Sequence, residues 1–211
     1  PVKGTLKPVG FAARAAYADK VMSFIEPSVL RPLKVVVNCG NGAAAPAYEA
    51  IKTRLQQHGA PLSFVDLFLE PDPAFPNGIP NPLLAENQPA TRDAVLAQGA
   101  DLGVAFDGDF DRCFFFDENG DFVPGEYVVG LLAAAFLEKE PGAGIVHDPR
   151  VVWSIQDIIQ RGGGTAIILN DLYVGGGIEM NFLGKPARTA LTTVGVIVGI
   201  LTIVTMVSLG I

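Results

Sequence analysis

The sequence "ADLGVAFDGDFDRCFFFDENGDF", residues 100–122, begins with an apolar run that is typical of a buried β-strand. Three aspartates, Asp107, Asp109 and Asp111, follow this run at every second position. In an extended chain alternate side chains point to the same face, so the three carboxylates would gather on one side and repel one another. The spacing therefore predicts a bound cation between them.

A calcium loop of the helix-loop-helix type is one candidate for this cation site. Asp107, Asp109 and Asp111 take the first, third and fifth places of such a loop, and Glu118 takes the twelfth. The sixth place needs glycine for a sharp bend, but this sequence has Arg112 there. The pattern therefore disfavours a calcium loop.

Two other kinds of site fit the order of residues better. An aspartate-nucleophile phosphatase would also place an Asp-x-Asp pair at a strand end, with Asp107 as the nucleophile, and would continue with a small residue and Thr or Val. This chain continues with Phe110, Asp111 and Arg112. A third carboxylate in place of a hydroxyl favours a site for Mg²⁺, with Gly108 letting the backbone curl round the ion. Arg112 would then face a phosphate held by the same cation.

Strand and helix patterns alternate on both sides of the aspartates. Apolar runs predict strands at residues 33–38, 61–67, 100–106, 143–148 and 165–169, and a hairpin turn is predicted at Asn119 and Gly120 between residues 112–116 and 121–125. Helices are predicted at residues 12–25, 45–59, 91–99, 126–140 and 151–163, with Thr91 as a helix cap, and a long loop at 70–88. This order predicts a three-layer α/β fold with the aspartates at the carboxyl edge of its sheet.

The composition limits the classes of function. The 211 residues are 49% hydrophobic and 18% charged, which suits one domain or a domain with an appendage. A net charge of -7 without a basic stripe disfavours nucleic acid as a partner, so we expect none. Cys39 and Cys113 lie far apart and form no C-x-x-C pair, and the first 16 residues lack the apolar core of a secretory signal. These features predict a cytoplasmic location for the main body of the protein.

The last 23 residues differ from the rest of the chain. Residues 189–211 contain no charged side chain, and Lys185 and Arg188 lie just before them. About 20 apolar residues suffice to cross a bilayer, and basic residues are typical of a cytoplasmic flank. We therefore predict a transmembrane helix and a membrane contact at residues 189–211, with a fully buried helix as the alternative.

Several segments resemble the α-D-phosphohexomutase family. The segment "GADLGVAFDGDFDRCFFFDENGDFVPGE" looks like the metal-binding loop of that family. The segments "KVVVNCGNGAA", "FPNGIPNPL", "TRDAV", "GLLAAAFLEKEPGAGIVHDPR" and "DIIQRGGGTA" look like its bacterial phosphomannomutase branch, in the same order. The resemblance covers residues 12–168, and the Asp-Gly-Asp-x-Asp-Arg element within it is highly specific.

This resemblance implies a fold, a reaction and a set of site residues. It implies an α/β/α metal-binding domain of an enzyme that interconverts mannose 6-phosphate and mannose 1-phosphate, or the glucose phosphates, through a bisphosphate. Asp107, Asp109 and Asp111 would hold Mg²⁺ together with a phosphoserine from a preceding domain. Arg112 would be catalytic and contact the phosphate or sugar of the hexose phosphate substrate. Arg150 would also bind the substrate.

The sequence also departs from the family pattern. No segment resembles the serine loop that carries the phosphate, and the later sugar-recognition loops are missing. We therefore expect a lead-in segment at 1–30, a metal-binding domain at 31–169, a linker at 170–188 and a hydrophobic tail at 189–211 that resembles a membrane helix of macrolide-exporter-type permeases. This fragment is expected to be inactive alone. An aspartate-nucleophile phosphatase and a membrane-anchored fragment without catalysis remain the alternatives.

Overall fold

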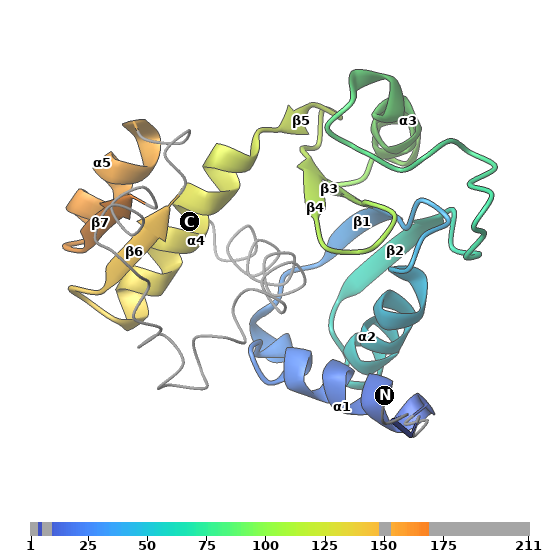
Figure 1. Ribbon diagram of the computed structural model, residues 1–211, viewed down its shortest axis with the longest axis horizontal. Helices are drawn as coiled ribbons and strands as arrows, with labels where there is room; N and C mark the ends of the chain where they lie inside the picture. Colours follow the sequence, from blue (N-terminus) through green and yellow to red (C-terminus); the bar gives the residue numbers. More distant parts are fainter. Residues whose placement is uncertain (1–3, 6–9, 148–152, 169–211) are drawn as a thin grey trace.

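The computed structural model describes residues 4, 5, 10–147 and 153–168 (Figure 1). Within these residues, no helix has the length and apolar character needed to cross a membrane. The predicted transmembrane helix at 189–211, the linker at 170–188 and Arg150 all lie outside the described residues. The predictions made for them therefore remain predictions.

A five-stranded sheet forms the main body, in the order β2-β1-β3-β4-β5. Its strands are β1 (Leu33–Asn38), β2 (Leu62–Leu67), β3 (Leu102–Phe106), β4 (Cys113–Phe116) and β5 (Phe122–Val123). β1 pairs in parallel with β2 and β3, whereas β4 pairs antiparallel with both β3 and β5. The predicted hairpin turn between β4 and β5 is confirmed, with Gly120 at a φ of 74°.

Helices cover both faces of this sheet, which makes the three predicted layers (Figure 1). The helices α1 (Gly10–Met22) and α2 (Ala45–Gln57) pack together on one face, and α3 (Pro89–Gln98) covers the other. The short 3₁₀ helices η1 (Pro27–Val29) and η2 (Ala85–Asn87) lie in the connections. β3 is buried along its whole length and β1 along nearly all of it, as expected for central parallel strands.

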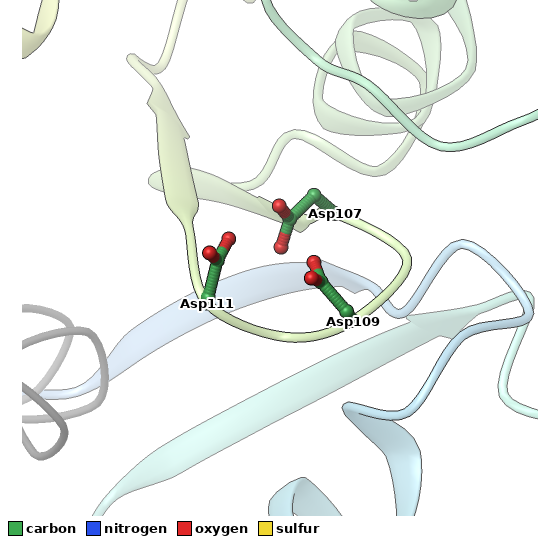
Figure 2. Close-up of side chains that lie close together, drawn as sticks. All are labelled: Asp107, Asp109 and Asp111. Carbon is green, nitrogen blue, oxygen red and sulfur yellow. The ribbon is translucent and has the colours of Figure 1, made fainter.

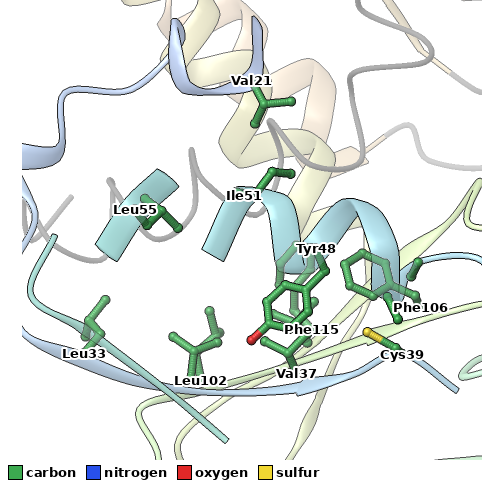
Figure 3. Close-up of a cluster of buried hydrophobic side chains, with 14 of the residues drawn as sticks. Val21, Leu33, Val37, Cys39, Tyr48, Ile51, Leu55, Leu102, Phe106 and Phe115 are labelled. Carbon is green, nitrogen blue, oxygen red and sulfur yellow. The ribbon is translucent and has the colours of Figure 1, made fainter. Parts of the chain in front are cut away.

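Alternate residues of the central strands serve different layers. Val35 and Val37 of β1 join the cluster under α1 and α2, part of which is shown in Figure 3, while Val36 joins Val95 in the cluster under α3. This division follows the two-residue period of a β-strand. The core therefore holds both faces of β1 and β3 rigid up to their carboxyl ends.

The remaining elements form a second, smaller unit. They are α4 (Gly125–Lys139), β6 (Gly144–His147), α5 (Trp153–Arg161) and β7 (Thr165–Ile168), and β6 pairs in parallel with β7 in a sheet of its own. Ala133, Leu137, Ile155 and Ile159 form a separate buried cluster between the two helices and this sheet. The expectation of one layered sheet therefore holds only for the first five strands. The hairpin of β4 and β5 occupies the edge beside β3, and the two-residue β5 offers too little backbone to pair with another strand.

Thr91 has a different role from the one predicted. It lies inside α3, which begins at Pro89, and its buried hydroxyl accepts a hydrogen bond of 3.0 Å from the side-chain amide of Asn38. Proline suits the first turn of a helix because its missing N–H would have no partner there. Thr91 therefore links α3 to the end of β1 and does not cap the helix.

Candidate metal centre

The three aspartates lie in the short loop that joins β3 to β4. The N–H of Asp107 donates to the carbonyl of Arg112 at 3.4 Å. Within the loop, the N–H of Phe110 donates to the carbonyl of Asp107 at 3.3 Å. Phe110 adopts a φ of 66°, in the left-handed region that residues other than glycine seldom occupy. The loop is therefore a tight turn and not the extended strand that the alternate spacing suggested, and Phe110, not Gly108, has the left-handed conformation.

This turn brings the three carboxylates together (Figure 2). Each of the three aspartates offers one carboxylate oxygen, and these three oxygens lie within 4.8 Å of one another. Asp107 is buried, with 1% of its surface exposed, whereas Asp109 and Asp111 are exposed. Oxygens from three carboxylates in such a small volume suit a hard cation such as Mg²⁺, which prefers oxygen ligands.

Burial changes the acidity of the innermost carboxylate. It raises the pKa of Asp107, and the neighbouring Asp111 carboxylate raises it further, while hydrogen bonds from Arg112 act in the opposite direction. The pKa of Asp111 is lowered by hydrogen bonding to Asp107 and then to Arg112. Burial and the nearby Asp111 carboxylate thus disfavour the charged form of Asp107, which is the condition that a bound cation would relieve.

Arg112 contacts two of the three aspartates. Its Nε donates to Oδ2 of Asp107 at 2.7 Å and to Oδ1 of Asp111 at 3.2 Å, and its backbone N–H donates to Oδ1 of Asp107 at 3.0 Å. These two carboxylates raise the pKa of Arg112. Half of the side chain is exposed to solvent. Arg112 is thus a permanent positive charge on the solvent-exposed side of the acidic cluster.

A second segment, the turn between β1 and α2, lies against the aspartate loop. The N–H of Ala43 donates to the carbonyl of Gly108 at 3.0 Å. A Cβ on Gly42 would lie only 2.7 Å from that same carbonyl oxygen, so only glycine fits there. Nothing in the sequence indicated that this connection touches the aspartate loop.

The structure also decides against a calcium loop at the acidic cluster. Residues 113–116 form β4, and Glu118 lies in the turn between β4 and β5, so no calcium loop extends to Glu118. Among the predicted site residues, Asp107, Asp109, Asp111 and Arg112 come together, and Arg150 lies outside the described residues.

Comparison with known proteins shows the family. Residues 15–120 match the family described as phosphoglucomutase/phosphomannomutase, alpha/beta/alpha domain II. The phosphomannomutase of Salmonella montevideo is 52% identical over 174 residues, which cover 78% of this chain and 38% of that protein. The phosphomannomutase of Escherichia coli K12 is 54% identical over 155 residues, which cover 74% of this chain and 34% of that protein. This chain thus spans less than half the length of these relatives.

Solved structures agree with these sequence matches. A phosphoglucomutase/phosphomannomutase family protein from Burkholderia thailandensis superposes with a TM-score of 0.67 at 28% identity, over 78% of this chain and 36% of that one. The parafusin phosphoglucomutase from Paramecium has the same fold, with a TM-score of 0.64 at 16% identity, over 92% of this chain and 38% of that one. Because the family match covers half of the chain and includes the three aspartates, the chain belongs to the phosphoglucomutase/phosphomannomutase family.

Proposed function

We propose that this chain supplies the metal-binding part of a phosphomannomutase, an isomerase that interconverts mannose 6-phosphate and mannose 1-phosphate. The observation that carries the proposal is the cluster of three carboxylates within 4.8 Å of one another, next to the guanidinium of Arg112. The relatives that are about half identical to the chain are named phosphomannomutases, which supports the choice of reaction. Glucose phosphates are the other substrates that we propose.

Asp107, Asp109 and Asp111 would hold the cation, and we propose Mg²⁺. When bound there, Mg²⁺ supplies charge stabilisation to the phosphoryl group that is being transferred. A structural neighbour, the N-acetylphosphoglucosamine mutase of Aspergillus fumigatus, is described in complex with GlcNAc-6P and magnesium. Arg112 and the buried position of Asp107 preorganise the ligand set, because the guanidinium fixes the orientation of the Asp107 carboxylate.

Arg112 has a second task in the proposed reaction. Its exposed half would meet a phosphate oxygen of the hexose phosphate, and its raised pKa keeps the group charged throughout. Phosphoryl transfer depends mainly on positioning and on stabilising negative charge, so a fixed guanidinium suits this reaction. We propose Arg150 as a further substrate contact. The phosphoserine implied by the family resemblance would come from another part of a longer protein.

The phosphatase alternative is less well supported. A nucleophilic Asp107 would need a carboxylate oxygen aimed at the substrate, but both of its oxygens accept hydrogen bonds from Arg112 and its surface is 1% exposed. These contacts are compatible with a metal ligand, because each carboxylate oxygen keeps a second lone pair for a cation. The phosphomannomutase names of the relatives favour the mutase as well.

Titration calorimetry with MgCl₂ tests the metal site in the full chain. We expect Asp109→Ala to weaken Mg²⁺ binding by about tenfold or more, because one of three charged ligands is lost. Asp93→Ala is the matched control, since Asp93 is an exposed aspartate that pairs with Arg92 away from the cluster. Equal binding heats for the wild type and Asp109→Ala would contradict the metal site.

An activity assay distinguishes the two enzyme classes. Turnover of mannose 1-phosphate that requires a hexose bisphosphate indicates a mutase, whereas phosphate release without this activator indicates a phosphatase. We expect neither from the 211-residue chain, because its sequence holds no counterpart of the phosphoserine loop. Phosphate release that Asp107→Asn abolishes would overturn the proposed function in favour of the phosphatase.

A further inference from the structure

Asn41 lies in the turn between β1 and α2 in an unusual conformation. Its φ is 56°, in the left-handed region, and only 7% of its surface is exposed. Asparagine tolerates this region better than most residues, but glycine would adopt it with less strain. The reason for asparagine at this position therefore lies in the polar groups of its side chain.

All four polar groups of Asn41 bond to one segment, the beginning of the long loop that follows β2. This segment, residues 68–77, is named here the clasp segment. The backbone N–H of Asn41 donates to the Phe68 carbonyl at 2.8 Å, and its carbonyl accepts from the Asp72 N–H at 2.9 Å. Its side-chain amide donates to the Glu70 carbonyl at 2.8 Å, and its side-chain oxygen accepts from the Asn77 amide at 2.8 Å.

The residues next to Asn41 carry this connection to the aspartate loop. Ala43 donates its N–H to the carbonyl of Gly108, the residue between Asp107 and Asp109. Gly42 fits against the same carbonyl only because it has no side chain. A shift of the turn would therefore move the backbone that separates two of the proposed metal ligands.

The clasp segment also contacts Gly108 directly. A Cβ built on Gly108 would lie 3.3 Å from the ring carbon Cζ of Phe75, so this ring packs against the backbone of the aspartate loop. Gly108 is thus held between the turn that contains Asn41 and the clasp segment to which Asn41 binds. Asn41 joins the two sides of this arrangement.

We infer that Asn41, through its bonds to the clasp segment, is a positioning residue that holds Gly108 and thereby sets the spacing of the Asp107 and Asp109 carboxylates for the cation. This inference rests on the proposed function, because it concerns the geometry of the same metal site. Asn77 takes part through its amide bond to Asn41. Groups that orient metal ligands without touching the metal commonly change metal affinity by 10- to 100-fold.

The test compares three variants of the full chain by titration calorimetry with MgCl₂. Asn41→Gly keeps the left-handed backbone and removes both side-chain bonds, so we expect the Kd for Mg²⁺ to rise about tenfold. Asn77→Ala removes one of these bonds and should raise the Kd about threefold. Asn119→Ala is the matched control, because its side-chain amide bonds Asp117 in the turn between β4 and β5, away from the Asn41 turn and the clasp segment. We expect its Kd to stay within about twofold of the wild type.

A second measurement separates positioning from a general loss of structure. The backbone amide resonance of Gly108 should shift in the Asn41→Gly and Asn77→Ala variants and stay unchanged in Asn119→Ala, all at a temperature far below unfolding. A wild-type Mg²⁺ affinity retained by Asn41→Gly, or lost equally in Asn119→Ala, would overturn the positioning role alone. Absence of any Mg²⁺ heat in the wild type would overturn the proposed function and the positioning role together.

Discussion

Nε of Arg112 lies 2.7 Å from Oδ2 of Asp107, and the two side chains differ sharply in burial: half of Arg112 is exposed, but only 2% of Asp107. The guanidinium thus reaches from solvent to a carboxylate at the end of a buried strand. A buried carboxylate without a partner would be costly, so this contact stabilises the aspartate loop as well as orienting a proposed metal ligand.

Replacing this arginine should lower the stability of the protein. In Arg112→Gln the Asp107 carboxylate loses its charged partner and keeps only the backbone N–H, so we expect the free energy of unfolding to fall by about 1–2 kcal/mol. Urea denaturation measures this change. Arg161→Gln is the control, because Arg161 pairs with Asp157 on the exposed surface of α5, and such pairs contribute below about 1 kcal/mol. Equal losses in the two variants would show that the Arg112 contact is no stronger than a surface ion pair.

Gly42 should not tolerate a side chain. A Cβ there would lie 2.7 Å from the Gly108 carbonyl oxygen, so Gly42→Ala must push the turn and the aspartate loop apart. We expect a loss of about 1–3 kcal/mol in the free energy of unfolding, as in other overpacked sites. Gly125→Ala is the control, since a Cβ on Gly125, the first residue of α4, would meet no atom within 4 Å. A Gly42→Ala variant as stable as Gly125→Ala would disprove the close contact.

Alkaline pH should destabilise the protein through its buried acids. Burial is the main cause that raises the pKa of Cys39 from 9.0 to about 12, and burial followed by a hydrogen bond to Asp66 raises the pKa of Tyr48. The folded state keeps these protons at a pH where the unfolded chain loses them. Their contribution to the free energy of unfolding is therefore fully present below about pH 9 and is lost as the pH rises toward about 12.

The size of this effect can be measured at two pH values. From about pH 8 to about pH 10.5, Cys39 alone should cost about 2 kcal/mol of unfolding free energy, at about 1.4 kcal/mol for each pH unit above its unfolded pKa. Urea denaturation of the wild type and Cys39→Ala at both values tests this, with a smaller pH dependence expected in the variant. Identical slopes would mean that the Cys39 thiol does not contribute.

The second unit should respond separately to a change in its own core. Ile159→Ala removes a side chain that is 1% exposed from the cluster between α4 and α5, at a cost of about 2–4 kcal/mol. We expect faster amide hydrogen exchange in β7 and little change in β1, because the buried clusters of the two units share no residues. Val36→Ala should give the reverse pattern. Equally faster exchange in β1 and β7 would show one cooperative unit instead.

Much of the fold could be predicted from local patterns. The strand at 33–38 was predicted at its observed bounds, and the order of helices and strands follows the predicted one within a few residues at each end. Continuous apolar strands and amphipathic helices depend on neighbours within a few positions, so their patterns are visible in the sequence. The clustering of Asp107, Asp109 and Asp111 was also predictable, because the three residues lie within one short loop.

Long-range packing decided the rest. The contact between Ala43 and Gly108, the bond between Asn41 and Asn77 and the bond between Asn38 and Thr91 each join residues more than 30 positions apart. No local pattern encodes such pairs, because they form only when parallel strands bring their carboxyl ends to one edge of the sheet. The pairing of β6 with β7 in a sheet of their own is likewise a tertiary effect, because the hairpin of β4 and β5 already occupies the edge of the first sheet beside β3. The sequence by itself therefore determined the elements and the acidic loop, whereas tertiary packing alone decided which backbone holds that loop in place.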